Sequence, residues 1–367
     1  MSLIRRLFRK EKPTIHPEVP ALTTWQQRAL AVPGEESGAL PDATAVQMQR
    51  DAMIQTALTI KKLGVLAAGY RIEPGDASAT ARRAATYIEG ELNQMEGSPH
   101  GVMFAAMDAF ARGWSIQELV FERRDHQVGL RAIRPKDPSL FGLKMSSAGR
   151  IEGVELHLPG ETPRAVPRDR FVIYLYRPSY RRLKGMSDLE AAHPHWRAKT
   201  GLLDAWRLHL ERFASPTVLG QYQRGLPAEE QAAILAALRD LHRNTAVVYP
   251  DEIRVDLLGG GKESSSGFIE AIEFHNREMA RAILGQTLTT DEGRRIGSLA
   301  LGRVHLQILL LQLDALRREL EDGVMTEQVI KPLVQLNFGD VPVPRFRFDP
   351  VRATAFAAAL GAIDAKD

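Results

Sequence analysis

Two long helical patterns on either side of a compact insert constrain the fold of this chain more than any other feature of its sequence. Residues 187–214 and 267–284 each repeat side chains at spacings of three, four or seven, which is typical of helices that bury one face. The first repeat is Leu189, His193, Trp196, Thr200, Leu203, Leu210 and Phe213, and the second is Ile269, Ile272, Asn276, Met279 and Ile283. We therefore expect two long helices joined through the insert, residues 215–266.

The ends of these helices carry different signals. Ser187 and Glu190 form a capping box, in which a hydroxyl and a carboxylate bind free N–H groups at a helix start. Pro194 follows inside the pattern, so the first helix either kinks there or starts there, and Pro216 ends it. The second helix is expected from Phe268, and at about 1.5 Å per residue it would reach about 25 Å.

The insert predicts a small α/β domain. Pro227 starts a short helical pattern, and "TAVVYP" and "IRVDLL" are typical of short strands. "GGGKESSSG", residues 259–267, suggests a nucleotide-binding loop, but the first glycine position of that motif holds Asp256 and Lys262 is followed by Glu263 instead of Ser or Thr. A flexible connector is therefore favoured.

The regions before and after this arrangement predict an α+β fold. Helical patterns start at Asp42 and cover residues 79–95 and 101–113, where Gly113 is expected to cap the last helix. Four alternating segments at 114–124, 128–135, 150–158 and 170–178 then predict a mostly antiparallel sheet. Towards the C-terminus we expect an apolar helix over 298–323, another over 325–339, a strand at 344–348 and a short alanine-rich helix.

Composition limits the classes of function that are open to this chain. The 367 residues suggest two or three subdomains, and 44% hydrophobic with 25% charged residues is ordinary for a globular protein. A net charge of +3 is too small for a high-affinity DNA-binding protein, so any nucleic-acid contact should be weak or local. The absence of cysteine excludes disulfides, thiolate metal sites and cysteine catalysis.

The sequence also lacks targeting signals. The basic segment "MSLIRRLFRKEKP" has no apolar core of a signal peptide, and no run is long and apolar enough to cross a bilayer. We expect a cytoplasm-like compartment and no membrane contact. The basic segment is interpreted as a solvated tail, or alternatively as a contact for DNA or a partner.

No pattern predicts catalysis. His193 and His195 lack helical ligand spacing and a third ligand, and the adjacent carboxylates of Asp291 and Glu292 diverge. Neither G-x-S-x-G nor H-E-x-x-H occurs. We therefore expect no enzyme, no cofactor, no metal site and no catalytic residue.

Several segments together resemble one family. They are "GMSDLEAAHPHWRAKTGLLDAWRLHLERFASPTVLGQY", "NTAVVYPDEIRVDLL", "ILGQTLTTDEGRRIGSLALGRVH" and "LVQLNFG" followed by "PRFRF". Between about Asp42 and Phe348 the chain resembles the portal proteins of Mu-like tailed phages and prophages, and the "AILGQTLTT" string with the downstream "LNFG" is the most specific part. The resemblance implies a ring, typically of twelve subunits, at one capsid vertex, through which DNA is packaged and ejected.

The resemblance also implies a division of the chain. The expected parts are an extended N-terminal arm (1–41), an α+β wing (42–186), a first stem helix (187–214), an α/β clip (215–266), a second stem helix (267–284), a tunnel loop (285–297), a tunnel helix with a return to the wing (298–349) and a minimal crown (350–367). The interruption between two helices at 285–297 would then let a polar loop project into a channel.

Three sets of site residues follow from this division. The tunnel loop would offer Gln286, Thr287, Thr289, Thr290, Asp291, Arg294 and Arg295 to DNA; the channel face of the second stem helix would carry Glu270, Glu273, Arg277 and Arg281; and the clip would present Glu229, Glu230 and Arg239 to partners. A channel in which DNA slides should mix acid and base, because many phosphate contacts would hold the duplex. Glu273 and Arg277 are also an i, i+4 pair that would simply stabilise the helix.

The implied partners are further copies of the chain, the terminase large subunit, a head–tail adaptor, the major capsid and scaffolding proteins, and double-stranded DNA bound without sequence preference. The implied location is the portal vertex of the virion, after assembly in the host cytoplasm. Apolar stem residues such as Leu203 and Leu210 would pack either within one subunit or between subunits. The alternatives are another virion subunit, such as an adaptor or baseplate protein, and a nucleic-acid-processing enzyme.

Overall fold

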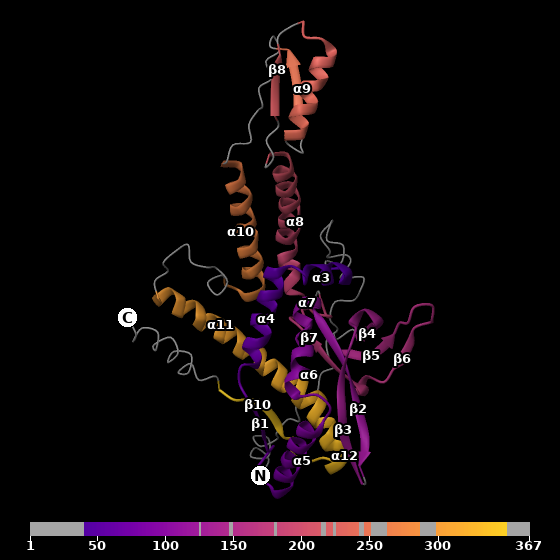
Figure 1. Ribbon diagram of the computed structural model, residues 1–367. Helices are drawn as coiled ribbons and strands as arrows, with labels where there is room; N and C mark the ends of the chain where they lie inside the picture. The colour runs from indigo at the N-terminus through magenta and orange to yellow at the C-terminus, as the bar shows by residue number, and fades with distance from the viewer. Residues whose placement is uncertain are drawn as a thin grey trace, which may run out of the picture. The chain divides into compact units, whose positions relative to one another are not determined.

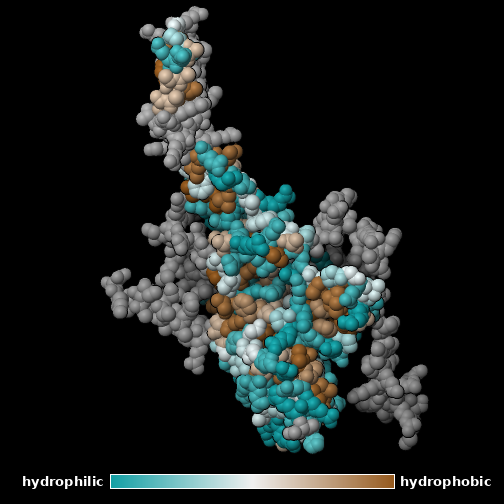
Figure 2. Space-filling view, turned by 45° about the vertical axis from the view of Figure 1, so that its right-hand side comes forward, coloured by the Kyte–Doolittle hydropathy of each residue, from teal (hydrophilic) through white to brown (hydrophobic). Residues whose placement is uncertain are grey.

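The computed structural model describes nine segments of the chain, and these fall in two units. The described residues are 40–124, 126–146, 150–179, 182–213, 218–222, 225–241, 246–250, 263–286 and 299–350. Unit 1 comprises Met1–Gln49, Leu58–Glu190 and Leu306–Asp367, and unit 2 comprises Arg50–Ala57 and Ala191–His305. Figure 1 labels the elements, and Figure 2 shows the hydropathy of one face of the molecule.

The first part of the chain forms five helices where the sequence predicts three. They are α3 (Asp42–Met48), α4 (Ala52–Leu66), α5 (Ala79–Gln94), α6 (Pro99–Ala106) and α7 (Ala109–Arg112). The helix predicted from Asp42 is divided because the Asp51 carboxylate accepts the Met53 N–H at 2.9 Å and thereby starts a new helix. Gly113 ends α7 at φ 85°, in the left-handed conformation expected of a C-cap glycine.

Unit 1 contains two three-stranded antiparallel sheets, so the predicted α+β class is confirmed. One sheet has the order β3 (Gln127–Lys136), β2 (Trp114–Arg124), β7 (Phe171–Leu175), and the other has β4 (Phe141–Met145), β5 (Ile151–Leu156), β6 (Arg164–Val166). Short 3₁₀ turns, η1 (Pro138–Leu140) and η2 (Arg168–Arg170), precede β4 and β7. Ile116, Leu143 and Phe171 belong to one buried cluster that draws on both sheets. The strands β4 and β6 were not predicted, because each is short and has little alternation.

A single helical run replaces the two helices expected between residues 298 and 339. It consists of α11 (Leu299–Glu319), a π-helix η3 (Leu320–Ile330) and α12 (Lys331–Phe338). The prediction of a break at Gly323 is therefore wrong. The strand β10 (Arg345–Phe348) follows and pairs antiparallel with β1 (Tyr70–Glu73), so that Tyr70 lies opposite Phe348.

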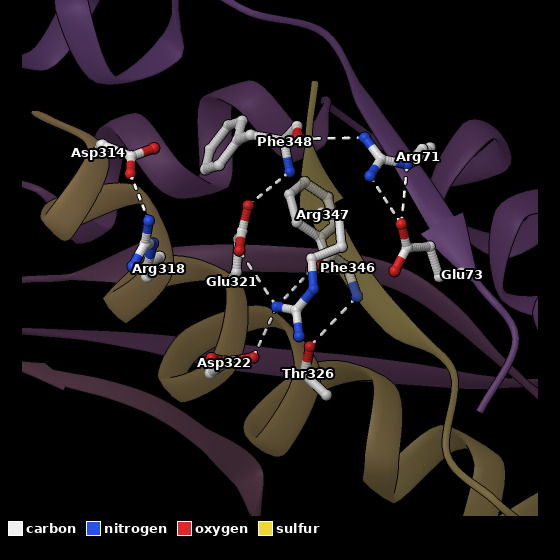
Figure 3. Close-up of polar contacts among 10 residues, drawn as sticks. All are labelled: Arg71, Glu73, Asp314, Arg318, Glu321, Asp322, Thr326, Phe346, Arg347 and Phe348. Carbon is white, nitrogen blue, oxygen red and sulfur yellow. Dashed lines mark hydrogen bonds and ion pairs between the residues drawn. The ribbon is translucent and has the colours of Figure 1, made fainter. Parts of the chain in front are cut away.

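The π-helix has a local reason. The Asp349 N–H donates to the Gly69 carbonyl at 2.8 Å, so the N–H groups of Phe346 and Phe348 point to the opposite edge of β10. There the Glu321 carboxylate accepts the Phe348 N–H at 2.7 Å and the Thr326 hydroxyl accepts the Phe346 N–H at 3.2 Å (Figure 3). Glu321 and Thr326 are five residues apart, and the i→i+5 hydrogen bonding of a π-helix aligns residues at that spacing on one face.

A further side chain of the π-helix forms hydrogen bonds with the edge of another strand. Gln328 accepts the Ile173 N–H and donates to the Ile173 carbonyl, each at 2.8 Å. Its carbonyl oxygen also accepts a hydrogen bond from Arg168 at 2.8 Å. Exposed strand edges are templates for unwanted pairing, and η3 therefore covers an edge of β7 as well as an edge of β10.

Unit 2 contains the two long helices predicted from the sequence. They are α8 (Asp188–Phe213), whose first three residues belong to unit 1, and α10 (Glu263–Leu284). Because α8 begins at Asp188 and contains Pro194, the capping box marks its true start. The helix α10 begins at Glu263, before the expected Phe268, so the second part of "GGGKESSSG" is helical and not a connector. Its 22 residues reach about 33 Å.

The insert between these helices is an α/β unit, in which the predicted helix and the predicted strand at "TAVVYP" are present, whereas the other observed strand, β8, was not predicted. The strands β8 (Val218–Tyr222) and β9 (Ala246–Pro250) pair in parallel, and α9 (Ala228–Leu241) connects them. A parallel pair needs such a crossover connection. The segment "IRVDLL" and the alanine-rich helix expected at the C-terminus lie outside the described residues.

Candidate functional site

The start of α8 is fixed by the predicted capping box and by a contact with α7. The Ser187 N–H donates to the Glu190 carboxylate at 3.2 Å, and the Ser187 hydroxyl accepts the Leu189 N–H at 2.9 Å. The same hydroxyl donates to the Ala111 carbonyl at 2.7 Å. Gly185 precedes this turn with φ 91°, and a Cβ atom there would lie 2.1 Å from the Gly113 carbonyl oxygen. The start of α8 is therefore held against α7 by backbone packing that only glycine permits.

A buried ion pair lies at this attachment. The Lys61 ammonium is 2.6 Å from an oxygen of the Asp188 carboxylate, and the two side chains expose 10% and 1% of their surface. Lys61 and the Tyr176 hydroxyl are 2.8 Å apart, and that hydroxyl donates to the second Asp188 oxygen at 3.0 Å. The Lys61 nitrogen also lies over the Phe110 ring, 4.8 Å from its centroid. Both charges therefore have hydrogen-bond partners in a buried place, as buried charges require.

Burial dominates the electrostatics of this cluster. It lowers the pKa of Lys61 and raises the pKa of Asp188, because loss of hydration outweighs the attraction between the two charges. Burial also raises the pKa of Tyr176 far above its ordinary value, so its hydroxyl stays protonated and donates to Asp188. These groups hold the base of α8 in place; nothing in their geometry resembles a reactive centre.

In unit 2 two histidines join the long helices. The Nδ1 atoms of His195 on α8 and His275 on α10 are 3.1 Å apart, so one imidazole donates and the other accepts. Loss of hydration and the neighbouring His195 lower the pKa of His275, while Glu278 opposes them. One turn further along α8, Lys199 binds Asp51 at 2.6 Å. The spacing between His193 and His195 does not predict a metal ligand, and the partner His275 could not be identified from spacing within either helix.

The four residues predicted for the channel face lie along α10. Their spacing of three and four places Glu270, Glu273, Arg277 and Arg281 on one side of the helix. Glu270 and Arg281 are exposed, whereas Glu273 and Arg277 are partly buried. Arg281 pairs with Glu278, a residue that was not among those predicted. That this side faces a channel stays a prediction.

Most of the predicted tunnel loop lies outside the described residues. This applies to Thr287, Thr289, Thr290, Asp291, Arg294 and Arg295. Gln286, the first residue of the set, is described, and its side chain is 4% exposed at the end of α10. Gln286 thus lies in the interior of the fold in this structure, and the role of the loop stays a prediction.

The clip residues are only partly described. Glu229 and Glu230 occupy the first turn of α9, where negative charge is favourable, and both are exposed. The side chain of Arg239 lies outside the described part of the chain. Exposure makes the two glutamates available to a partner, and no described contact employs them within unit 2.

Neither a metal centre nor a membrane span is found among the residues that the structure describes. Within the described segments, no three His, Asp or Glu side chains are grouped so that they could hold a metal ion. No described helix combines the length and the apolar character needed to cross a bilayer.

Comparison with known proteins identifies the family. The family model for the portal protein of Mu bacteriophage matches residues 43–364. The portal protein of Escherichia phage Mu is 25% identical over 300 residues, which are 79% of this chain and 56% of that protein. The Mu-like prophage FluMu protein gp29 of Haemophilus influenzae is 26% identical over 325 residues, 85% of this chain and 61% of that protein. The chain thus spans less than two thirds of either curated relative.

A solved structure shares the fold. It is the neck of a native gene transfer agent particle, computed with C12 symmetry, and it matches with a TM-score of 0.57 at 15% identity over 89% of this chain and 90% of that one. The likeness at this identity concerns the fold alone. Since the family model covers most of the chain, this protein belongs to the family of Mu bacteriophage portal proteins.

Proposed function

We propose that this chain is a subunit of a closed ring at one vertex of a phage capsid, and that the hole of the ring is the channel for genome packaging and ejection. The match of residues 43–364 to the portal family carries the proposal. Two long helices on either side of the β8–α9–β9 unit support it. The shared fold with a neck computed with C12 symmetry favours about twelve copies per ring.

The distribution of apolar side chains on the long helices supports assembly. On α8, Leu203 and Leu210 are each 42% exposed, and on α10 Phe274 is 47% exposed, although such residues usually bury their surface. Met279 and Ile283 near the end of α10 are buried within the chain. We therefore assign packing between subunits to the exposed residues Leu203, Leu210 and Phe274. Packing within the subunit is assigned to the buried residues Met279 and Ile283. A heterologous contact that closes by rotation yields a ring.

The channel would be lined by the charged side of α10 and by the tunnel loop. Glu270, Glu273, Arg277 and Arg281 mix acid and base, which lets a duplex slide because few phosphates are neutralised at once. Replacement of Arg294 and Arg295 by Ala should leave ring mass unchanged and alter the amount of DNA retained in assembled particles. Loss of the ring itself would show that these arginines are structural.

The clip would bind the terminase large subunit during packaging and a head–tail adaptor afterwards, while the wing would meet capsid and scaffolding proteins. The exposed pair Glu229 and Glu230 offers negative charge for the first of these contacts. Charge reversal by Glu229→Lys and Glu230→Lys should weaken terminase binding in a pull-down with purified rings. Unchanged binding would reject this face. The ring would form in the host cytoplasm and remain at the portal vertex of the virion.

Electron microscopy of the purified chain tests the proposal. We expect ring-shaped particles with a central opening wide enough for duplex DNA. A solid particle would contradict the channel and favour another virion subunit, such as an adaptor or baseplate protein.

A further inference from the structure

Unit 1 contains a hollow to which the proposed function assigns no role. It has a volume of about 540 Å³ and opens between α5, β3 and α12. Its lining includes Arg82, Arg83, Thr86 and Tyr87 of α5, Gln127 of β3 and Phe338 of α12. We call it the Arg83 groove. Phe338 belongs to the "LNFG" segment, which the sequence analysis singled out and to which the proposed function gives no task.

Asn337 connects the three elements that line the groove. Its amide nitrogen donates to the Tyr87 hydroxyl at 3.1 Å and to the Val128 carbonyl at 3.0 Å, and its amide oxygen accepts the Val128 N–H at 2.8 Å. The Tyr87 hydroxyl itself donates to the Val128 carbonyl at 2.5 Å. One side chain thus ties α12 to β3 and to α5. The groove is therefore formed before any ligand arrives, which lowers the cost of binding.

Two aromatic rings give the groove an apolar floor. The centroids of Tyr87 and Phe338 are 5.5 Å apart in an edge-to-face arrangement. Burial raises the pKa of Tyr87 to about 12, with Glu91 as the second cause, so the phenol is neutral at physiological pH. The rings can therefore receive an aromatic or aliphatic side chain.

The rim of the groove is cationic. Arg83 forms no ion pair with any residue that the structure describes, and Arg82 donates to the Ala77 carbonyl at 2.7 Å. Arg82 also attracts the Asp76 carboxylate, which accepts the Ser78 N–H at 2.9 Å. Several other exposed arginines of unit 1 bind a carboxylate, for example Arg131, which binds Glu96. Figure 2 shows the end of unit 1 that contains α5 and α12 as mainly hydrophilic with smaller apolar areas.

We propose that the Arg83 groove is a docking site for an acidic peptide segment of a partner protein, with one apolar side chain on the Tyr87–Phe338 floor and carboxylates on the two guanidinium groups. Arginine binds carboxylates with two parallel hydrogen bonds. The volume suits one or two side chains of a peptide. A nucleic acid fits less well, because firm binding of a duplex needs about six to ten phosphate contacts and the groove offers two cations.

Fluorescence anisotropy with the full chain tests this proposal. The probe is a fluorescein-labelled heptapeptide in which a phenylalanine is flanked on each side by two glutamates. The double variant Arg82→Gln/Arg83→Gln should weaken binding by at least about tenfold, because charged hydrogen bonds are lost. Arg83→Gln alone should weaken it less. The control is Arg345→Gln, which removes an exposed arginine of unit 1 outside the groove and should leave the affinity unchanged.

Two further probes separate the parts of the proposal. A peptide with alanine in place of phenylalanine should bind more weakly, and a peptide with lysines in place of the glutamates should not bind. Equal binding by the wild type and the double variant would overturn the proposal. So would a duplex DNA probe that binds more tightly than the peptide and is lost in the same double variant. Because the groove lies within unit 1, the particle mass measured in parallel shows separately whether rings form.

Discussion

Unit 1 and unit 2 use their apolar side chains in different ways. Unit 1 buries large residues such as Phe110 and Phe346 completely, and its exposed large residues, such as Leu63, Leu311 and Leu336, are spread over several helices. In unit 2, α8 and the first part of α10 leave Leu203 and Phe274 nearly half exposed. Burial of apolar surface is the dominant force in folding and in association. In the proposed ring, the exposed residues of the long helices would pack against neighbouring copies, whereas the buried core of unit 1 forms within one chain.

The largest effect is expected from the replacement of Lys61 by Met, which removes the closest cation from the buried Asp188 carboxylate and leaves only the exposed Arg177, at 3.6 Å. Breaking a buried ion pair costs about 3–5 kcal/mol. The free energy of unfolding of unit 1, measured by urea denaturation, should fall by this amount. Lys62 is the control, because it pairs with Asp108, whose side chain is 54% exposed. Lys62→Met should cost about 1 kcal/mol or less, and equal costs would contradict the account.

Negative charges at Leu203 and Leu210, on the exposed apolar surface of α8, should weaken assembly without destabilising the fold. Leu203→Asp combined with Leu210→Asp should raise the concentration at which half of the chains are assembled by at least about tenfold. The unfolding of unit 1 should change by no more than about 0.5 kcal/mol. Sedimentation velocity measures the assembly. Leu336→Asp, a change at a leucine of unit 1 that is 57% exposed, is the matched control and should leave assembly intact. The same result for both variants would remove the distinction between the units.

Within unit 1, the π-helix should hold β10 through buried hydrogen bonds. Thr326→Val removes the acceptor for the Phe346 N–H and should cost about 1–3 kcal/mol. Hydrogen exchange should show faster exchange of that amide. Thr86→Val removes an exposed hydroxyl and should cost less than about 0.5 kcal/mol. Unchanged exchange at Phe346 would show that η3 does not fix the strand.

The smallest effect is expected from pH at the His195–His275 pair of unit 2. The folded pKa of His275 lies below its ordinary 6.5, so the folded chain prefers the neutral imidazole. The stabilisation is complete above pH 6.5 and declines as pH falls below 6.5 towards the folded pKa. Glu278, which pairs with Arg281 on α10, opposes this shift. The melting temperature of unit 2 should fall with pH in this range, and His275→Gln should flatten the curve. An equally steep curve in the variant would show that the His195–His275 pair does not cause the pH dependence.

Local signals predicted parts of the fold well. The Ser187–Glu190 capping box and the Gly113 cap act within a few residues, and both are present. The alternation of apolar residues predicted the antiparallel strands of unit 1 for the same reason. Pro194 left two alternatives, because a helix start and a kink have the same sequence signal, and only the structure separates them.

Other features depend on contacts that are distant in the sequence. The helical run continues through Gly323 because Glu321 and Thr326 bind β10, which no local pattern reports. The Asn337 amide beside the groove donates a hydrogen bond to the Tyr87 hydroxyl, which lies 250 residues earlier in the sequence. The sequence resemblance singled out the segment that contains Asn337, but it could not show which side chains that residue contacts. The candidate channel residues were named from the resemblance and await a test.

The mass of the purified particle tests the central claim most directly. The chain has a mass of 40.8 kDa, and light scattering should report a discrete species of about twelve times this mass, with no continuous series of intermediates. A single chain of 40.8 kDa at every concentration would contradict the ring. It would also contradict the proposal that the exposed apolar residues of α8 and α10 pack between subunits.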